Sequence, residues 1–183
     1  MEIINITDEE KKRSFEFAEK IITNNNQFNR FSKSIDTQIK RTYIGKLAEY
    51  VFFHYLISKN ISVIEGDMFV IYDGAENTDE ADFMTKNGNS IDIKTASLPF
   101  HKRIMIPLSQ AHLVKDYYVG IKLHFTTSNN EIIDPFDINK ATIYGYIERE
   151  TIMSQPSRDF GEGFCKSYLL SDLKPLEFLI NKF

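Results

Sequence analysis

The sequence contains a single cysteine, Cys165, which excludes an internal disulfide and any zinc site built from several cysteines. It also lacks long apolar runs. The longest, YVFFHYLI and MFVIY, fall well short of the roughly 18 to 20 residues that cross a bilayer. The N-terminal stretch MEIINITDEEKKR has no apolar signal core. We therefore expect a cytoplasmic protein without a membrane partner.

The sequence also has no excess of positive charge, since its formal net charge is -4. This argues against a general electrostatic grip on nucleic acid. Basic residues do gather locally, at 11–13, at 39–41 with Lys46 beyond, and at 101–103, although such clusters are more often solvated faces than phosphate contacts. Carboxylates that hold metal ions contribute negative charge that bound cations cancel. An acidic chain is therefore compatible with a metal site.

Material for one packed interior is present. The chain has 183 residues, of which 42% are hydrophobic, with 15 phenylalanines and nine tyrosines. It shows no internal repeat, low-complexity tract or linker. We expect one domain over 1–183, with a core over about 40–126, an N-terminal helix at 8–23 and a C-terminal elaboration over 140–183.

Hydrophobic periodicity predicts the order of elements. Asp8 is the expected cap of a helix over 8–23, and a long amphipathic helix is expected over 36–58. Three consecutive antiparallel strands should follow, and a short helix near 108–115 should precede a buried strand over 117–126. The three strands are expected at 61–73, 81–85 and 90–95; the later elements are a strand at 141–148, a helical turn at 149–155, a strand at 163–170 and a helix at 173–182. The order indicates an α/β (α+β) fold with a central mixed β-sheet flanked by helices.

The chemically informative strand reads SIDIKT. Strand alternation sends Ile91 and Ile93 to one face, and Asp92 and Lys94 to the other. A buried charge costs free energy unless it is paired or bound to metal. The alternative is a salt bridge on a solvated face, which would carry no chemistry.

Whether a second acid joins Asp92 depends on the preceding hairpin. A two-residue Asn87-Gly88 turn would place Asp82 opposite Ile93, on the wrong face. A three-residue loop over 86–88, with Gly88 in the left-handed conformation, pairs position 82 with position 92. Both loops are common; we predict the second, which makes the two carboxylates converge.

Converging carboxylates beside a lysine suit phosphodiester hydrolysis. Hard oxygen ligands bind Mg²⁺, which also contacts phosphate. The ion polarises the phosphoryl group and activates water. Lys94 would orient the attacking water and stabilise the transition state by its charge. The four histidines lack metal-ligand spacing, and we expect them to be structural or surface groups: His54, His101, His112 and His124.

The arrangement of GKLAE on a helix, an Asp, and a hydrophobic-Asp-x-Lys strand ten residues later resembles the PD-(D/E)xK nuclease superfamily over about residues 40–126. Gly45 matches a small residue of the family's helix, and Ala81 stands where proline often precedes the motif acid. The resemblance implies a restriction-endonuclease-like core. It also implies the catalytic residues Asp82, Asp92, Lys94 and Glu49, with the metal on Asp82, Asp92 and Glu49. The segment IMIPLSQAHLVKDYYVGIKL resembles the family's helix before its fourth core strand, which makes Gln110 a supporting residue.

The function this predicts is a Mg²⁺-dependent DNA endonuclease of restriction type, in which Mn²⁺ can substitute. A homodimer would suit cleavage of both strands at a symmetric site. Alternatives are a repair or recombination nuclease, a non-catalytic DNA-binding or assembly module on the same fold, and an interaction protein with an acidic surface. Glu49 has an alternative as a charge on the helix rim. Asp79 and Glu80 are rivals to Asp82, and DNA contacts are expected over 129–139 and 158–166.

Overall fold

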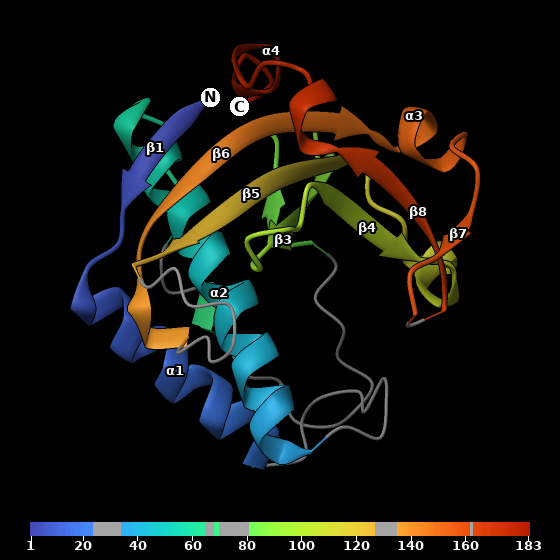
Figure 1. Cartoon of the computed structure of the whole chain (residues 1–183). Helices are drawn as coiled ribbons and strands as arrows, with labels where there is room; N and C mark the ends of the chain where they lie inside the picture. The colour runs from blue at the N-terminus through green and yellow to red at the C-terminus, as the bar shows by residue number, and fades with distance from the viewer. Residues whose placement is uncertain (24–33, 65–67, 70–80, 127–134, 162) are drawn as a thin grey trace.

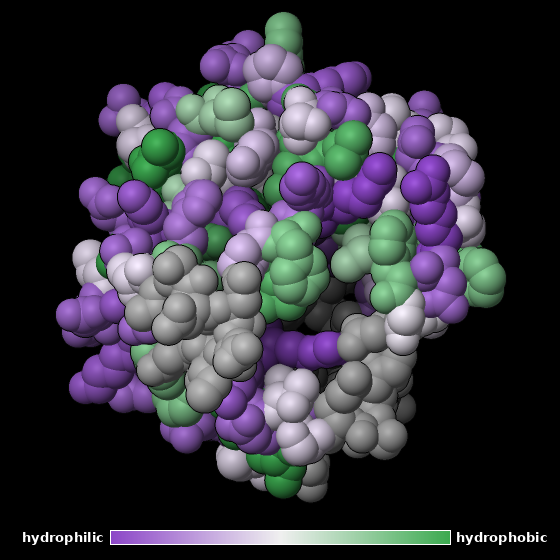
Figure 2. All heavy atoms as spheres, viewed as in Figure 1, coloured by the Kyte–Doolittle hydropathy of each residue, from purple (hydrophilic) through white to green (hydrophobic). Residues whose placement is uncertain are grey.

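A computed structural model describes residues 1–23, 34–64, 68–69, 81–126, 135–161 and 163–183 (Figure 1; Figure 2 shows all heavy atoms in the same view). These residues form a curled mixed sheet. The two long helices lie on one side of it, and a smaller sheet packs on the other side. The prediction of a mixed α/β fold with a central mixed sheet flanked by helices is confirmed. No helix of the described part of the chain combines the length and apolarity that a membrane span requires.

The central sheet has the strand order β1-β6-β5-β3-β2. Its strands are β1 (Glu2–Asn5), β2 (Phe83–Met84), β3 (Ser90–Ala96), β5 (Tyr117–Phe125) and β6 (Ile138–Glu148). β3 and β5 run parallel, and the other neighbours are antiparallel. The smaller antiparallel sheet has the order β4-β8-β7. Its strands are β4 (Arg103–Pro107), β7 (Arg158–Asp159) and β8 (Phe164–Leu169).

Two long helices cover one face of the central sheet. α1 (Asp8–Thr23) has the predicted bounds, and α2 (Ile35–Ser58) begins one residue earlier than predicted. α2 packs on α1 and against β3 (Figure 1). The shorter helical segments are η2 (Leu108–Leu113), η3 (Pro135–Asp137), α3 (Arg149–Met153), η4 (Leu170–Asp172) and α4 (Glu177–Ile180).

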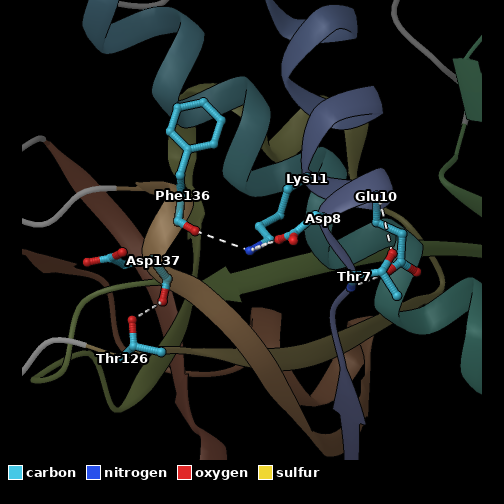
Figure 3. Close-up of polar contacts among 7 residues, drawn as sticks. All are labelled: Thr7, Asp8, Glu10, Lys11, Thr126, Phe136 and Asp137. Atoms are coloured by element: carbon cyan, nitrogen blue, oxygen red, sulfur yellow. Dashed lines mark hydrogen bonds and ion pairs between the residues drawn. The ribbon is translucent and has the colours of Figure 1, made fainter.

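The cap of α1 differs from the prediction, because Thr7 rather than Asp8 precedes the first helical residue. The Thr7 backbone amide and hydroxyl donate to Glu10 Oε2 at 2.6 and 2.8 Å, and the Glu10 amide donates back to Thr7 Oγ1 at 3.3 Å (Figure 3). This reciprocal capping box satisfies two helix-end donors. Asp8 instead pairs with Lys11 at 2.6 Å, and Lys11 also donates to the Phe136 carbonyl, so α1 is tied to η3 (Figure 3).

The two faces of the central sheet are buried differently. One face packs on α2 in the main core, where alternate residues of β3 and β5 meet the apolar side of the helix. The contributing side chains include Ile91, Ile93, Val119, Ile121, Leu47, Val51 and Phe52. The other face packs Ala96 and Tyr118 against Ile104 of the smaller sheet. Gly120 is needed on this face, because a Cβ there would lie 2.4 Å from Leu173.

The expected strand over 61–73 is wrong where the structure describes it. Residues 61–64 have no regular structure, and Met68 with Phe69 forms a 3-10 turn; 65–67 and 70–73 lie outside the described residues. Met68 is buried in the main core, so packing rather than strand pairing accounts for its apolar character. The β2–β3 pair is antiparallel as predicted, whereas β1, β4 and β7 were not anticipated.

Candidate active site

The β2–β3 hairpin has the predicted three-residue loop. Phe83 pairs with Ile91, and the Thr85 amide donates to the Asn89 carbonyl at 3.0 Å, which leaves residues 86–88 as the loop. Gly88 has a φ of 76°, the left-handed conformation that glycine adopts without strain. Continued by one step, this register places Asp82 opposite Asp92.

Asp82 lies at the edge of the sheet, one residue before β2 begins. Its carboxylate Oδ2 accepts a hydrogen bond of 2.6 Å from the Ile93 amide, and its own amide donates to the Ile91 carbonyl at 3.0 Å. The carboxylate thus occupies the place that a strand carbonyl would take if β2 continued. A polar side chain in this position satisfies the β3 backbone and brings negative charge to the strand edge.

Three further charged residues act on the Asp82 carboxyl. Burial, followed by the negative charges of Glu49 and Asp92, raises the pKa of Asp82 well above its usual value. The Ile93 hydrogen bond and the charge of Lys94 oppose this rise. Charged groups of α2 and of β3 therefore both act on the Asp82 carboxyl at the sheet edge, and the predicted residues Glu49, Asp82, Asp92 and Lys94 share one electrostatic environment.

Asp92 and Lys94 form an ion pair of 2.5 Å on the face of β3 opposite the main core. Their side chains are 19% and 23% exposed, so the pair is largely buried and is not a salt bridge on a solvated face. The predicted alternation is confirmed, because Ile91 and Ile93 are buried in the main core. Lys94 Nζ also lies 5.9 Å from the centroid of the Tyr118 ring on neighbouring β5.

Glu49 is held by a lysine that sequence reasoning had not connected with it. Lys46 Nζ lies 2.5 Å from Glu49 Oε2, donates to the Met68 carbonyl at 2.7 Å, and sits 4.6 Å from the Phe17 ring centroid. The two side chains are 7% exposed for Lys46 and 16% for Glu49, which excludes a freely solvated rim charge. The signal in the sequence was the spacing of three residues on one helix.

Each acid is engaged within the protein. Asp82 accepts from Ile93, Asp92 pairs with Lys94, and Glu49 pairs with Lys46. Accordingly, across the described residues no three histidine, cysteine or acidic side chains are already grouped closely enough to hold a metal ion. The three carboxylates are oxygen ligands of the kind that Mg²⁺ prefers, and the charges of Glu49 and Asp92 raise the pKa of Asp82.

The other candidate residues are placed as follows. Gln110 is half-buried in η2, the segment that precedes β5, and its supporting role stays a prediction. Asp79 and Glu80 lie outside the described residues. His54 pairs with Glu10 at 2.8 Å, and His124 bonds Thr142 at 2.8 Å, in keeping with structural roles. DNA contacts were expected over 129–139 and 158–166. The structure describes residues 135–139 of the first region and all residues but 162 of the second.

Comparisons of this chain with protein-family models, with curated proteins and with solved structures find no match.

Proposed function

We propose that this chain is a divalent-metal-dependent DNA endonuclease that hydrolyses phosphodiester bonds. The observation that carries the proposal is the Asp82 carboxyl, on which charged residues of two other segments act, Glu49 of α2 and Asp92 with Lys94 of β3. Glu49 and Asp92 each pair with a lysine, as they would in a structural role, so these ion pairs do not distinguish the two roles. Here two carboxylates raise the pKa of a third, which is an unfavourable arrangement that proteins keep where charge has chemical use.

Glu49, Asp82 and Asp92 would hold the metal ion, and Mg²⁺, with Mn²⁺ as substitute, fits their oxygens. When bound, the ion supplies charge neutralisation at the scissile phosphate and a more acidic water. The three acids would hold the ion at the edge of the sheet. Asp82 is fixed there because its carboxylate accepts a hydrogen bond from the Ile93 amide. Lys94 would leave its 2.5 Å contact with Asp92 and direct its ammonium to the phosphate oxygens.

The fold suits this proposal. A long helix carrying Glu49, the hairpin with Asp82 and Asp92, and η2 leading to parallel β5 follow one another as expected for a restriction-endonuclease-like core. We assign the chain to a restriction-type role on that resemblance. Cleavage of both strands at a symmetric site would favour a homodimer.

The experiment is incubation of supercoiled plasmid with the purified protein in Mg²⁺, in Mn²⁺ and in EDTA. We expect nicked and linear products with either metal and intact plasmid with EDTA. Asp92→Asn should abolish cleavage, because it removes one ligand charge while preserving shape. Asp172→Asn, at an exposed position of η4, is the matched control and should cleave at the wild-type rate.

Intact plasmid under both metals, from a protein shown to be folded by circular dichroism, would contradict the proposal. Equal cleavage by wild type and Asp92→Asn would also contradict it, because the activity would then come from elsewhere. DNA binding without cleavage would favour the non-catalytic module instead.

A further inference from the structure

Beyond β3, the chain turns through a loop over 97–102 that is held unusually firmly. Lys122 of β5 is buried, and its ammonium donates to three carbonyls of this loop, those of Leu98, Pro99 at 3.2 Å and His101 at 3.0 Å. The loop also closes on itself, since the His101 amide donates to the Leu98 carbonyl at 2.9 Å. A buried ammonium with three acceptors fixes the loop backbone strongly.

This fixed loop presents a large apolar ring to solvent. Phe100 is 71% exposed at its turn, and its ring makes an edge-on contact with His101 at a centroid distance of 4.9 Å. Single exposed apolar side chains are ordinary on protein surfaces. What sets Phe100 apart is that its backbone is restrained by hydrogen bonds on both sides, so that the ring is held ready for a partner at little entropic cost.

The loop lies beside the candidate active site. In the β3–β5 register Lys94 pairs with Gly120, and Ala96 pairs with Lys122. Lys122, which anchors the loop, therefore lies two residues beyond Gly120 on the same face of β5. The distance between these two positions along the strand is about 7 Å. If a phosphate of a nucleic-acid strand bound Lys94, the adjacent nucleotides of that strand would lie near this loop.

The surroundings of Phe100 are basic, although the chain as a whole is acidic. The residues after it are His101, Lys102 and Arg103, and Lys102 is exposed. Burial, and to a lesser extent the charge of Lys122, lowers the pKa of His101, so the positive charge beside Phe100 comes from Lys102 and Arg103. A restrained aromatic ring with flanking cations matches the chemistry of a nucleotide strand, which offers base faces and phosphates, better than that of an apolar protein surface.

We propose that the loop over 97–102, together with Arg103 at the start of β4, is a nucleic-acid contact. In it Phe100 stacks on an unpaired base of the strand held at the candidate active site, and Lys102 and Arg103 contact adjacent phosphates. This inference rests on the proposed function for its substrate. It also has a consequence for the DNA, because a duplex would have to open or kink locally to offer a base to Phe100.

The test uses the absence of tryptophan from the chain. Phe100→Trp introduces one fluorescent reporter into the loop, and Phe178→Trp introduces a matched one at an exposed position of α4. Both are made in a Lys94→Met background with Mg²⁺, to keep the strand uncut, and are titrated with a thymidine oligonucleotide and with a duplex of equal length. We expect saturable quenching of the Phe100→Trp emission only, and more strongly by the single strand.

Affinity is measured in parallel by anisotropy of a labelled oligonucleotide. Phe100→Ala should weaken binding about tenfold, Phe100→Trp should restore it, and Phe178→Ala should leave it unchanged. Replacing Lys102 by Gln should reduce the salt dependence of binding by about one released counterion. Thermal unfolding of each variant checks that the fold is retained.

The outcomes separate this inference from the proposed nuclease function. Binding and plasmid cleavage with unchanged Phe100→Trp emission, or with full affinity in Phe100→Ala, would overturn the inference and leave the nuclease standing. Quenching without metal-dependent cleavage would support the inference and overturn the nuclease. If neither binding nor cleavage occurs, both fall, and a protein partner for Phe100 becomes the better explanation.

Discussion

Asp82 and Ile93 are joined across the edge of the central sheet by a hydrogen bond of 2.6 Å from the Ile93 amide to the Asp82 carboxylate. Two effects meet in this bond. It completes the backbone pairing of β3 just before β2 begins, and it holds a carboxylate within the influence of Glu49 and Asp92. The same side chain thus serves the fold and carries an electrostatic repulsion that a bound cation or protonation of the carboxyl would relieve.

Asp82→Asn should separate these two effects. The amide oxygen of asparagine can still accept from Ile93, whereas the charge that Glu49 and Asp92 oppose is gone. We expect cleavage to fall at least about 100-fold, while the free energy of unfolding at pH 7 stays equal or rises. Urea denaturation measures the second quantity, and a clear loss of stability would show that the carboxylate is favourable in the fold.

Lys94→Met should lower kcat by roughly 10² to 10³, because the charge that stabilises the transition state is lost. Metal affinity should hold or increase, since Asp92 is released from its 2.5 Å ion pair. Lys94→Arg should not restore the rate, because a planar guanidinium cannot replace a compact ammonium at this site. The check is single-turnover cleavage beside calorimetric Mg²⁺ binding. Near-normal turnover by Lys94→Met would reject the role.

Lys46→Met tests whether the buried pair with Glu49 matters to the fold. Removing Lys46 leaves a largely buried carboxylate without its cation at 2.5 Å and should cost about 3 kcal/mol of stability. Lys40→Met is the control on the same helix, where the exposed pair with Asp36 should contribute less than about 0.5 kcal/mol. Equal effects in urea denaturation would show that burial of the Lys46 pair has no consequence.

The parts of the fold that the sequence predicted are those set by local patterns. Residues 8–23 bury one side at helical spacing, whereas α2 is buried on nearly all sides from Tyr43 to Leu56. The apolar positions in both segments nevertheless identified the helices almost to the residue. Gly88 suits both of the loops that the sequence allowed for the hairpin, and the structure has the three-residue loop, which fixes the partner of Asp82. Such choices depend on a few neighbouring residues, so that distant parts of the chain do not alter them.

The parts that were missed depend on distant partners. β4 pairs with β8, some 60 residues later, and β1 pairs with β6 across most of the chain, so neither could be recognised from its own short run. The burial of Lys46 and of Lys122 is likewise invisible in sequence, where both read as ordinary surface charges. Conversely, Met68 and Phe69 belong to a run of strand-like composition, but these two residues form a turn packed on the main core.

The stability of the protein should fall in acid partly through Asp116. Its carboxylate accepts from the Ser90 amide at 2.8 Å and the Ser90 hydroxyl at 2.9 Å, and these bonds with the charge of Arg149 lower the pKa of Asp116 against the opposing effect of burial. A lowered pKa in the folded state gives stability that is present above the unfolded value and lost as pH falls through the folded one.

Asp116→Asn should therefore be less stable than wild type at pH 7, by about 1 kcal/mol or less because the group is partly exposed. The difference should persist down to about pH 5 and shrink below pH 4. Urea denaturation across this range is the measurement. A constant difference down to pH 2.5 would mean that the charge of Asp116 is not the cause.

The central claim is that Glu49, Asp82 and Asp92 form one divalent-cation site, and titration with Mn²⁺, followed by the electron paramagnetic resonance signal of the free ion, tests it most directly. We predict saturable binding to the wild-type protein, weakened at least about tenfold by Asp82→Asn or by Asp92→Asn, and unchanged in Asp172→Asn. Absence of saturable binding, or equal binding by all four proteins, would contradict the account.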